Sequence, residues 1–142
     1  MKLDGFGLFV VDMEKMVSFY RDILGFDIQY KPGDGNVYLV KDGVLFLMYG
    51  RKDFENMVSN KFHYPKGYNG TVEIALSVST YADVDSTYHT LKNQGVSILM
   101  TPQTMPWGQR TFYFADPEGN LIEVGSFQSN ESQKRSDYIL DS

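Results

Sequence analysis

The chain has 142 residues, of which 42% are hydrophobic and 15% aromatic, and its formal net charge is -5 at pH 7. This length fits one compact domain with its own core. The negative charge and the scattered Lys and Arg residues exclude a typical nucleic-acid binder, and no stretch reaches the roughly 18 apolar residues that span a bilayer. Because the chain has no cysteine, it has no disulfide or thiolate metal site. We expect a cytoplasmic protein with no nucleic-acid or membrane partner.

The first 50 residues predict the order strand, helix, strand, strand, strand. Asp12 follows a short apolar run and is a good helix cap before apolar residues at helical spacing. Gly25 ends the helix, and the pair Asp42-Gly43 between two later apolar runs indicates a tight hairpin. The expected elements are a strand at 6–11, a helix between Asp12 and Gly25, and strands at 26–30, 37–40 and 44–49.

The same order returns after residue 70, so the chain contains an internal repeat. A strand at 72–78 precedes an amphipathic helix that ends at Gly95, and three further strands follow. With small loop differences, Gly95 matches Gly25 of the first half. The expected organisation is one domain over 1–127, with modules at about 3–50 and 71–127, a linker at 51–70 and a polar tail at 128–142.

The sequence Asp-Pro-Glu-Gly-Asn at 116–120 has the chemistry of a turn between two strands. Proline fixes φ, glycine supplies a positive φ, and the Asp and Asn side chains satisfy backbone groups. We therefore expect a structural role for this motif.

Two stretches carry a family resemblance. Residues 10–26 read Val-Val-Asp-Met-Glu-(x)4-Phe-Tyr-Arg-Asp-Ile-Leu-Gly-Phe, and residues 107–123 read Trp-Gly-x-Arg-(x)5-Asp-Pro-Glu-Gly-Asn-(x)2-Glu. With the paired modules, they resemble the glyoxalase, bleomycin-resistance and extradiol dioxygenase (vicinal oxygen chelate) superfamily over about residues 3–127. The resemblance implies an α+β fold in which two tandem βαβββ modules form a cupped, incompletely closed, eight-stranded mixed sheet with helices outside. It also implies a small-molecule ligand in the cup and a homodimer.

In the metalloenzymes of this superfamily, the first and last strands of each module hold a divalent ion, commonly through His, Gln or Glu. The resemblance places Gly5, Leu47, Glu73 and Glu123 at these four positions. Zinc and nickel enzymes normally use imidazole, and magnesium or manganese needs further oxygen donors. Glu73 and Glu123 are therefore candidate ligands of a divalent metal, but we expect none to be tightly bound.

The same two carboxylates are the candidate catalytic residues. Ile74 and Leu76 alternate with Glu73, so Glu73 should face the cup and not the helix. Unpaired buried charge is costly, so each carboxylate must be paired, hydrated or functional. If Glu73 and Glu123 face each other, a shared proton would suit acid–base chemistry.

The candidate ligand-binding residues lie in both modules. Trp107 could form an aromatic wall and Arg110 a clamp for an anion or carbonyl group. Alternatively, Trp107 closes the cup and Arg110 pairs with Glu73 or Glu123. The remaining candidates, each of which also fits a packing or exposed role, are Tyr38, Met48, Tyr49 and the linker residue His63.

Two functions fit these residues. The first is a binding protein for a small, partly aromatic or cationic molecule, as the bleomycin-resistance branch of the superfamily implies. The missing metal donors at Gly5 and Leu47 and the acidic balance favour it. The second is a divalent-metal-dependent, glyoxalase-like lyase, epimerase or thiol transferase that uses Glu73 and Glu123.

Overall fold

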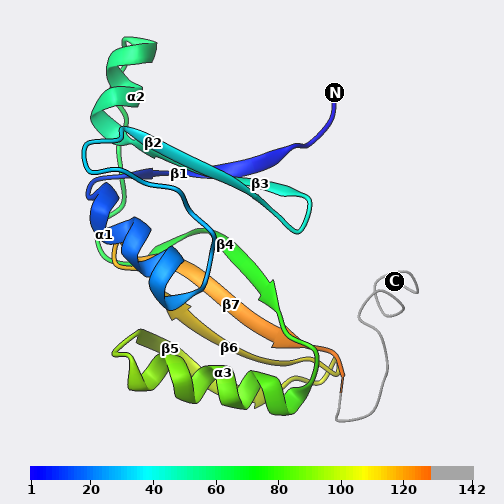
Figure 1. Ribbon diagram of the computed structural model, residues 1–142. Coiled ribbons are helices and arrows are strands. Elements are labelled where there is room, and N and C mark those ends of the chain that lie inside the picture. The colour runs from blue at the N-terminus through cyan, green and yellow to red at the C-terminus, as the bar shows by residue number, and fades with distance from the viewer. Residues whose placement is uncertain (129–142) are drawn as a thin grey trace. The chain divides into compact units, whose positions relative to one another are not determined.

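The computed structural model describes residues 1–128, and the predicted α+β class is confirmed (Figure 1). The chain divides into two compact units, Met1–Pro65 and a second that begins at Lys66. Hydrogen bonding joins the strands of residues 1–128 into one three-stranded and one four-stranded sheet. Each unit contains one of these sheets. The predicted tail lies outside the described residues except for Gln128.

The first unit contains a mixed sheet in the order β1-β3-β2. Strand β1 (Gly5–Val10) runs parallel to β3 (Val44–Gly50), and β2 (Asn36–Lys41) runs antiparallel to it. Asp42 and Gly43 join β2 to β3 with φ values of 52° and 78°. These left-handed conformations fit a two-residue hairpin turn, so the predicted hairpin is confirmed.

Helix α1 (Met13–Ser18) continues into a π-helical turn, η1 (Phe19–Ile23), and covers one face of this sheet. The side chain of Asp12 accepts a hydrogen bond of 3.0 Å from the backbone N–H of Lys15, which confirms the predicted cap. The ring of Tyr20 lies 5.0 Å from that of Phe46 on β3. Burial of these side chains gives the unit its core.

The strand predicted at 26–30 is wrong. The N–H of Phe26 donates to the carbonyl of Tyr20 at 2.8 Å, and the N–H of Ile28 donates to the carbonyl of Phe26 at 2.9 Å. Both side chains are buried. The alternating apolar pattern here reflects burial of one side of an irregular segment, because alternation alone does not require a neighbouring strand. Residues 1–128 therefore contain seven strands and not eight.

The segment predicted as a linker contains helix α2 (Arg51–Val58). No residue of this helix is fully buried, but Phe54 on its apolar side packs against the rings of Phe9 at 4.2 Å and Tyr49 at 5.8 Å. Arg51 ties it to its surroundings, because its Nε donates to the carbonyl of Phe9 at 3.1 Å and its guanidinium lies 4.1 Å from the ring centre of Tyr64.

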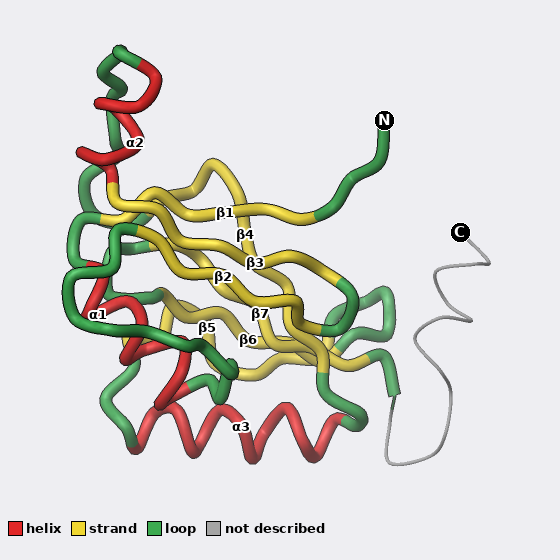
Figure 2. The backbone as a smooth tube through the Cα atoms, turned by 45° about the horizontal axis from the view of Figure 1, so that its top comes forward, coloured by secondary structure: helices red, strands yellow, loops and turns green. Residues whose placement is uncertain are grey.

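The second unit contains a sheet in the order β4-β7-β6-β5. The helix α3 covers one face of this sheet (Figures 1 and 2). A capping box between Thr80 and Asp83 begins α3, and Tyr88 on its buried side packs edge-to-face on Phe112 at 5.6 Å. No helix within residues 1–128 is long and apolar enough to cross a membrane. The elements are β4 (Asn69–Ser77), α3 (Tyr81–Asn93), β5 (Ser97–Thr104), β6 (Arg110–Ala115) and β7 (Asn120–Ser126).

The turn between β6 and β7 has the predicted structural role. Asp116 is buried, and its Oδ1 accepts hydrogen bonds from the backbone N–H groups of Glu118 at 2.9 Å and Asn120 at 3.0 Å. Gly119 has a φ of 88°. A Cβ atom at this glycine would lie 2.0 Å from the carbonyl oxygen of Gly67. The turn therefore fixes the start of β7.

We predict that Gly119→Ala destabilises the protein far more than Gly33→Ala. Both glycines have positive φ values, 88° and 95°, so alanine costs about 1–2 kcal/mol of backbone strain at either position. Nothing lies within 4 Å of a Cβ at Gly33, whereas the overlap at Gly119 adds about 1–3 kcal/mol. Urea unfolding followed by circular dichroism measures both values. Equal losses of unfolding free energy in the two variants would contradict this account.

Candidate functional site

The second sheet has two unlike faces. The face covered by α3 is apolar and includes Phe112 and Ile122. On the opposite face, Tyr113 of β6 pairs in register with Glu123 of β7, and Glu73 of β4 lies on the same side because side chains alternate along each strand. We call this opposite side the carboxylate face. Glu73 therefore has the orientation that the alternation predicted.

Glu123 is the central polar group of the carboxylate face. Its side chain is only 8% exposed. Its Oε2 lies 3.0 Å from the hydroxyl of Thr111 and 2.9 Å from that of Tyr113, while the Thr111 hydroxyl is also 3.1 Å from the carbonyl oxygen of Val124. Within residues 1–128, no cationic side chain pairs with Glu123, and its Oε1 has no hydrogen-bond donor. The carboxylate thus offers one unused oxygen.

Tyr113 donates a hydrogen bond to Glu123. Burial raises the pKa of the Tyr113 hydroxyl most, and interaction with the carboxylates of Glu123 and then Glu73 raises this pKa further. The phenol therefore stays protonated and donates a hydrogen bond to Oε2 of Glu123. Among the described residues, Glu73 and Glu123 share no direct hydrogen bond.

Trp107 lies in the turn between β5 and β6, at the end of the carboxylate face. Its side chain is 52% exposed, and its Nε1 donates a 3.0 Å hydrogen bond to Oε1 of Gln109. The backbone of Gly108 is held by Tyr81, whose hydroxyl donates to the Gly108 carbonyl. The turn thus presents a half-exposed aromatic ring from a fixed position.

Arg110 points to the other side of the sheet. Its Nε donates to Asp85 of α3 at 2.8 Å, and its Nη1 donates to Thr104 at 3.0 Å. The alternative expectation that Arg110 pairs with Glu73 or Glu123 is wrong. The reason is strand alternation, because Thr111 and Tyr113 face the carboxylates and Arg110 is one residue out of phase with them.

The candidates in the first unit are divided between the two faces of their sheet. Tyr38 and Tyr49 lie on the face away from α1, where Tyr38 is 70% exposed and the Tyr49 hydroxyl donates to Sδ of Met57 at 3.6 Å. Met48 lies on the opposite face, fully buried in the core. This is the packing role that the sequence left open for Met48, and it follows because adjacent strand residues point to opposite sides.

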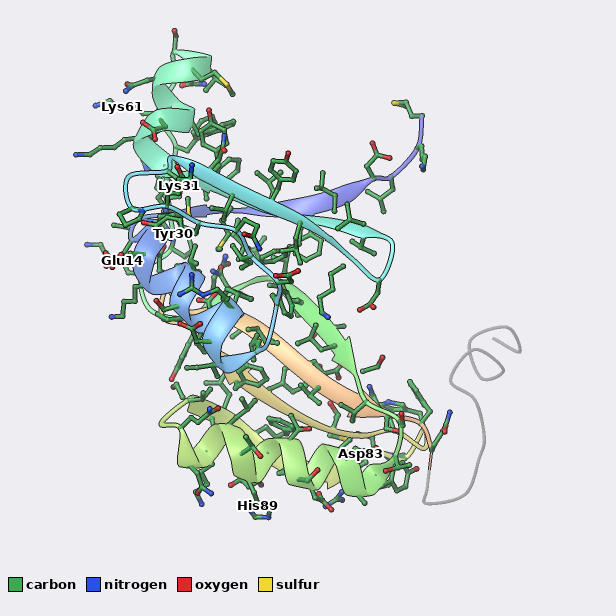
Figure 3. The ribbon with its side chains drawn as sticks, in the orientation of Figure 1. Glu14, Tyr30, Lys31, Lys61, Asp83 and His89 are labelled. Atoms are coloured by element: carbon green, nitrogen blue, oxygen red, sulfur yellow. The ribbon has the colours of Figure 1, made fainter. Side chains whose placement is uncertain are left out.

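Histidine does not contribute to the carboxylate face. His63 is exposed in the loop after α2, within the first unit. The other histidine, His89, is exposed on the outer side of α3 (Figure 3). No imidazole therefore lies beside Glu73 or Glu123 among residues of the second unit that the structure describes.

The residues present do not fit the four-donor metal site that the family resemblance implies. Leu47 has no metal-binding atom, and a Cβ at Gly5 would lie 2.0 Å from the carbonyl oxygen of Leu45, so no side chain fits there without moving the backbone. No group of three or more His, Cys, Asp or Glu side chains within residues 1–128 could hold a metal. Glu73 and Glu123 alone provide too few ligands for such a site.

Sequence reasoning missed three residues of this face, namely Gln109, Thr111 and Tyr113. The available signal was their spacing of two within the second family motif, in which Tyr113 pairs with Glu123 once β6 and β7 form a hairpin.

We predict that the stability of the protein falls as the pH rises above about 10, and that Tyr113→Phe weakens this dependence. The unfolded chain loses the Tyr113 proton near pH 10, but the folded protein retains it because the pKa is raised. The stabilising effect of the protonated phenol is fully present below this pH and is lost above it. Urea unfolding at pH 9 and pH 11 should show a larger loss for the wild type than for the variant. Equal losses would refute the buried hydrogen bond.

Comparisons with known proteins agree with this fold. A family model described as Glyoxalase/Bleomycin resistance protein/Dioxygenase superfamily matches residues 2–124. The chain is 30% identical over 127 residues to the uncharacterised protein YraH of Bacillus subtilis (strain 168), covering 87% of this chain and 97% of that protein. It is 33% identical over 124 residues to a probable lactoylglutathione lyase of Synechocystis, covering 81% and 87%. The crystal structure of a glyoxalase/bleomycin resistance protein/dioxygenase from Nocardioides matches with a TM-score of 0.76 and 23% identity, over 95% of this chain and 87% of that one. The chain therefore belongs to the glyoxalase/bleomycin resistance protein/dioxygenase superfamily.

Proposed function

We propose that this protein binds a small organic molecule on the carboxylate face and places a cationic or hydrogen-bond-donating group of that molecule against Glu123. The observation that carries the proposal is the 8% exposure of Glu123, combined with the unused Oε1 and the absence of a cationic partner within residues 1–128. Oε1 is accessible, because among the described residues the Tyr64 hydroxyl is the only fully buried side-chain N or O atom without a partner. A ligand that donates to Oε1 would form a charge-assisted hydrogen bond there.

The surroundings of Glu123 favour a ligand that is also partly apolar. Trp107 offers a half-exposed indole held by Gln109, and an aromatic face can pack against a ring or attract a cation. Arg110 is engaged by Asp85 on the other face, so no arginine of β6 competes for Glu123. An aromatic amine combines a donor for Glu123 with a ring for Trp107.

We predict that benzylamine binds the wild-type protein and that Glu123→Gln weakens this binding about tenfold or more, since it removes a charge-assisted hydrogen bond. Glu14→Gln is the matched control because it makes the same change of charge at an exposed residue of α1 (Figure 3). Isothermal titration calorimetry measures both affinities. Benzylamine binding that is equally strong in Glu123→Gln and Glu14→Gln would contradict the proposal.

A divalent-metal-dependent, glyoxalase-like lyase, epimerase or thiol transferase is the second candidate. Two observations favour it. Glu73 and Glu123 share one face, and a relative with 33% identity is named a probable lactoylglutathione lyase. The absence of donors at Gly5 and Leu47 counts against it.

Metal titration separates the two candidates. We expect calorimetric titration with manganese, nickel, zinc and magnesium to show no tight, stoichiometric binding, because two carboxylates provide too few ligands. Stoichiometric binding that is lost in both Glu73→Gln and Glu123→Gln would favour the metalloenzyme.

We also propose that the protein acts in the cytoplasm as a homodimer. In support, the face of the first sheet away from α1 carries exposed apolar side chains, with Phe9, Tyr38 and Val40 being 43%, 70% and 69% exposed. Such patches are typical of protein interfaces. Sedimentation equilibrium at micromolar concentration should therefore give twice the mass of the chain, and a monomer mass would contradict the dimer.

A further inference from the structure

Gln109 is a second nearly buried polar side chain, and its Nε2 group makes no hydrogen bond within residues 1–128. Gln109 is 7% exposed, and its Oε1 accepts the indole N–H of Trp107 at 3.0 Å. Because an indole nitrogen can only donate, this contact fixes which end of the amide is oxygen. The Nε2 group therefore points elsewhere, and within residues 1–128 its two N–H donors have no acceptor.

The position of this Nε2 group follows from Gly125 on β7. A Cβ atom at Gly125 would lie 2.6 Å from Nε2 of Gln109 and 3.3 Å from Oγ1 of Thr111. The Gln109 amide thus occupies the space over Gly125 that a side chain would fill. Thr111 in turn lies 3.0 Å from Glu123. The free donors of Gln109 and the free oxygen of Glu123 therefore belong to one continuous surface on the carboxylate face.

The two unused groups have complementary chemistry. Gln109 offers donors and Glu123 offers an acceptor, but Thr111 lies between them and they do not satisfy each other. Both atoms are accessible, because among the described residues only the Tyr64 hydroxyl is fully buried without a partner, but a bound ligand that covers them would remove them from water. A molecule that satisfies only one of them would leave the other unpaired, which is the physical basis of strong discrimination between similar ligands.

We propose that Gln109 is a specificity-determining residue, and that the ligand is a small molecule with a hydrogen-bond acceptor for Gln109, a donor for Glu123 and an apolar part near Trp107. This inference rests on the proposed function. Aromatic amides are the simplest members of this ligand class. Simple amines lack the acceptor, and simple carboxylates lack the donor and are repelled by Glu123.

The test compares benzamide, benzylamine and benzoate, which share a ring and differ in the polar group. In the full chain, Gln109→Glu keeps an acceptor for Trp107 but replaces the N–H donors with a negative charge. Calorimetry should show benzamide binding weakened about tenfold and benzylamine binding unchanged or tightened. Gln94→Glu, at an exposed position just after α3, is the control and should change neither. Benzoate should bind most weakly to the wild type.

The outcomes distinguish this inference from the proposed function. If benzylamine binds through Glu123 but Gln109→Glu weakens both probes equally, or weakens neither, Gln109 does not determine specificity and this inference fails alone. If none of the three probes binds the wild type, the proposed function fails and the inference fails with it.

A second measurement covers the case in which Gln109→Glu does not fold. In the ¹⁵N–¹H spectrum of the wild-type protein, a side-chain N–H proton of Gln109 should move downfield when benzamide is added, as expected when this proton gains an acceptor. Benzylamine should cause no downfield shift. Gln109 side-chain signals that stay unchanged while benzamide binds would overturn the inference.

Discussion

The candidate site depends on a single constraint, which is that Glu123 lies nearly buried without a cationic partner among the described residues. Two hydroxyl groups converge on its Oε2, and the raised pKa of Tyr113 keeps the phenol as a donor. Neutral donors stabilise a carboxylate without cancelling its charge. The remaining oxygen therefore retains its attraction for a donor or a cation, and this property gives the carboxylate face its chemical character.

The rest of the second unit holds this arrangement in place. The side chain of Asp116 secures the turn that begins β7 and so sets the position of Glu123 relative to Tyr113. On the other face, Arg110 links β6 to α3 through Asp85. Since both strands are fixed from outside the site, the fold does not depend on partners for Oε1 of Glu123 or Nε2 of Gln109. Binding residues can therefore keep unused donors and acceptors.

The sequence allowed the fold class and the repeat to be predicted because periodicity, caps and turns are local signals, as at Asp12 and the Asp42-Gly43 hairpin. It failed at 26–30, where burial of Phe26 and Ile28 produced alternation without strand pairing. At the site, alternation predicted the orientation of Glu73, and the same rule places Arg110 and Met48 on the helix-covered faces of their sheets. Gln109 was missed because its role depends on the missing side chain of Gly125 on another strand. The spacing of two from Thr111 indicates the face of Gln109 but not this contact between strands.

The central claim is that Glu123 is the group that meets the ligand, and carboxyl ¹³C NMR tests it most directly. The Glu123 side-chain carboxyl signal is assigned by its absence in Glu123→Gln, and benzylamine is then titrated into the wild-type protein. Our account predicts that this signal shifts in a saturable way while the carboxyl signal of the exposed Glu14 does not. A Glu123 signal that stays unchanged while benzylamine binds would contradict the account.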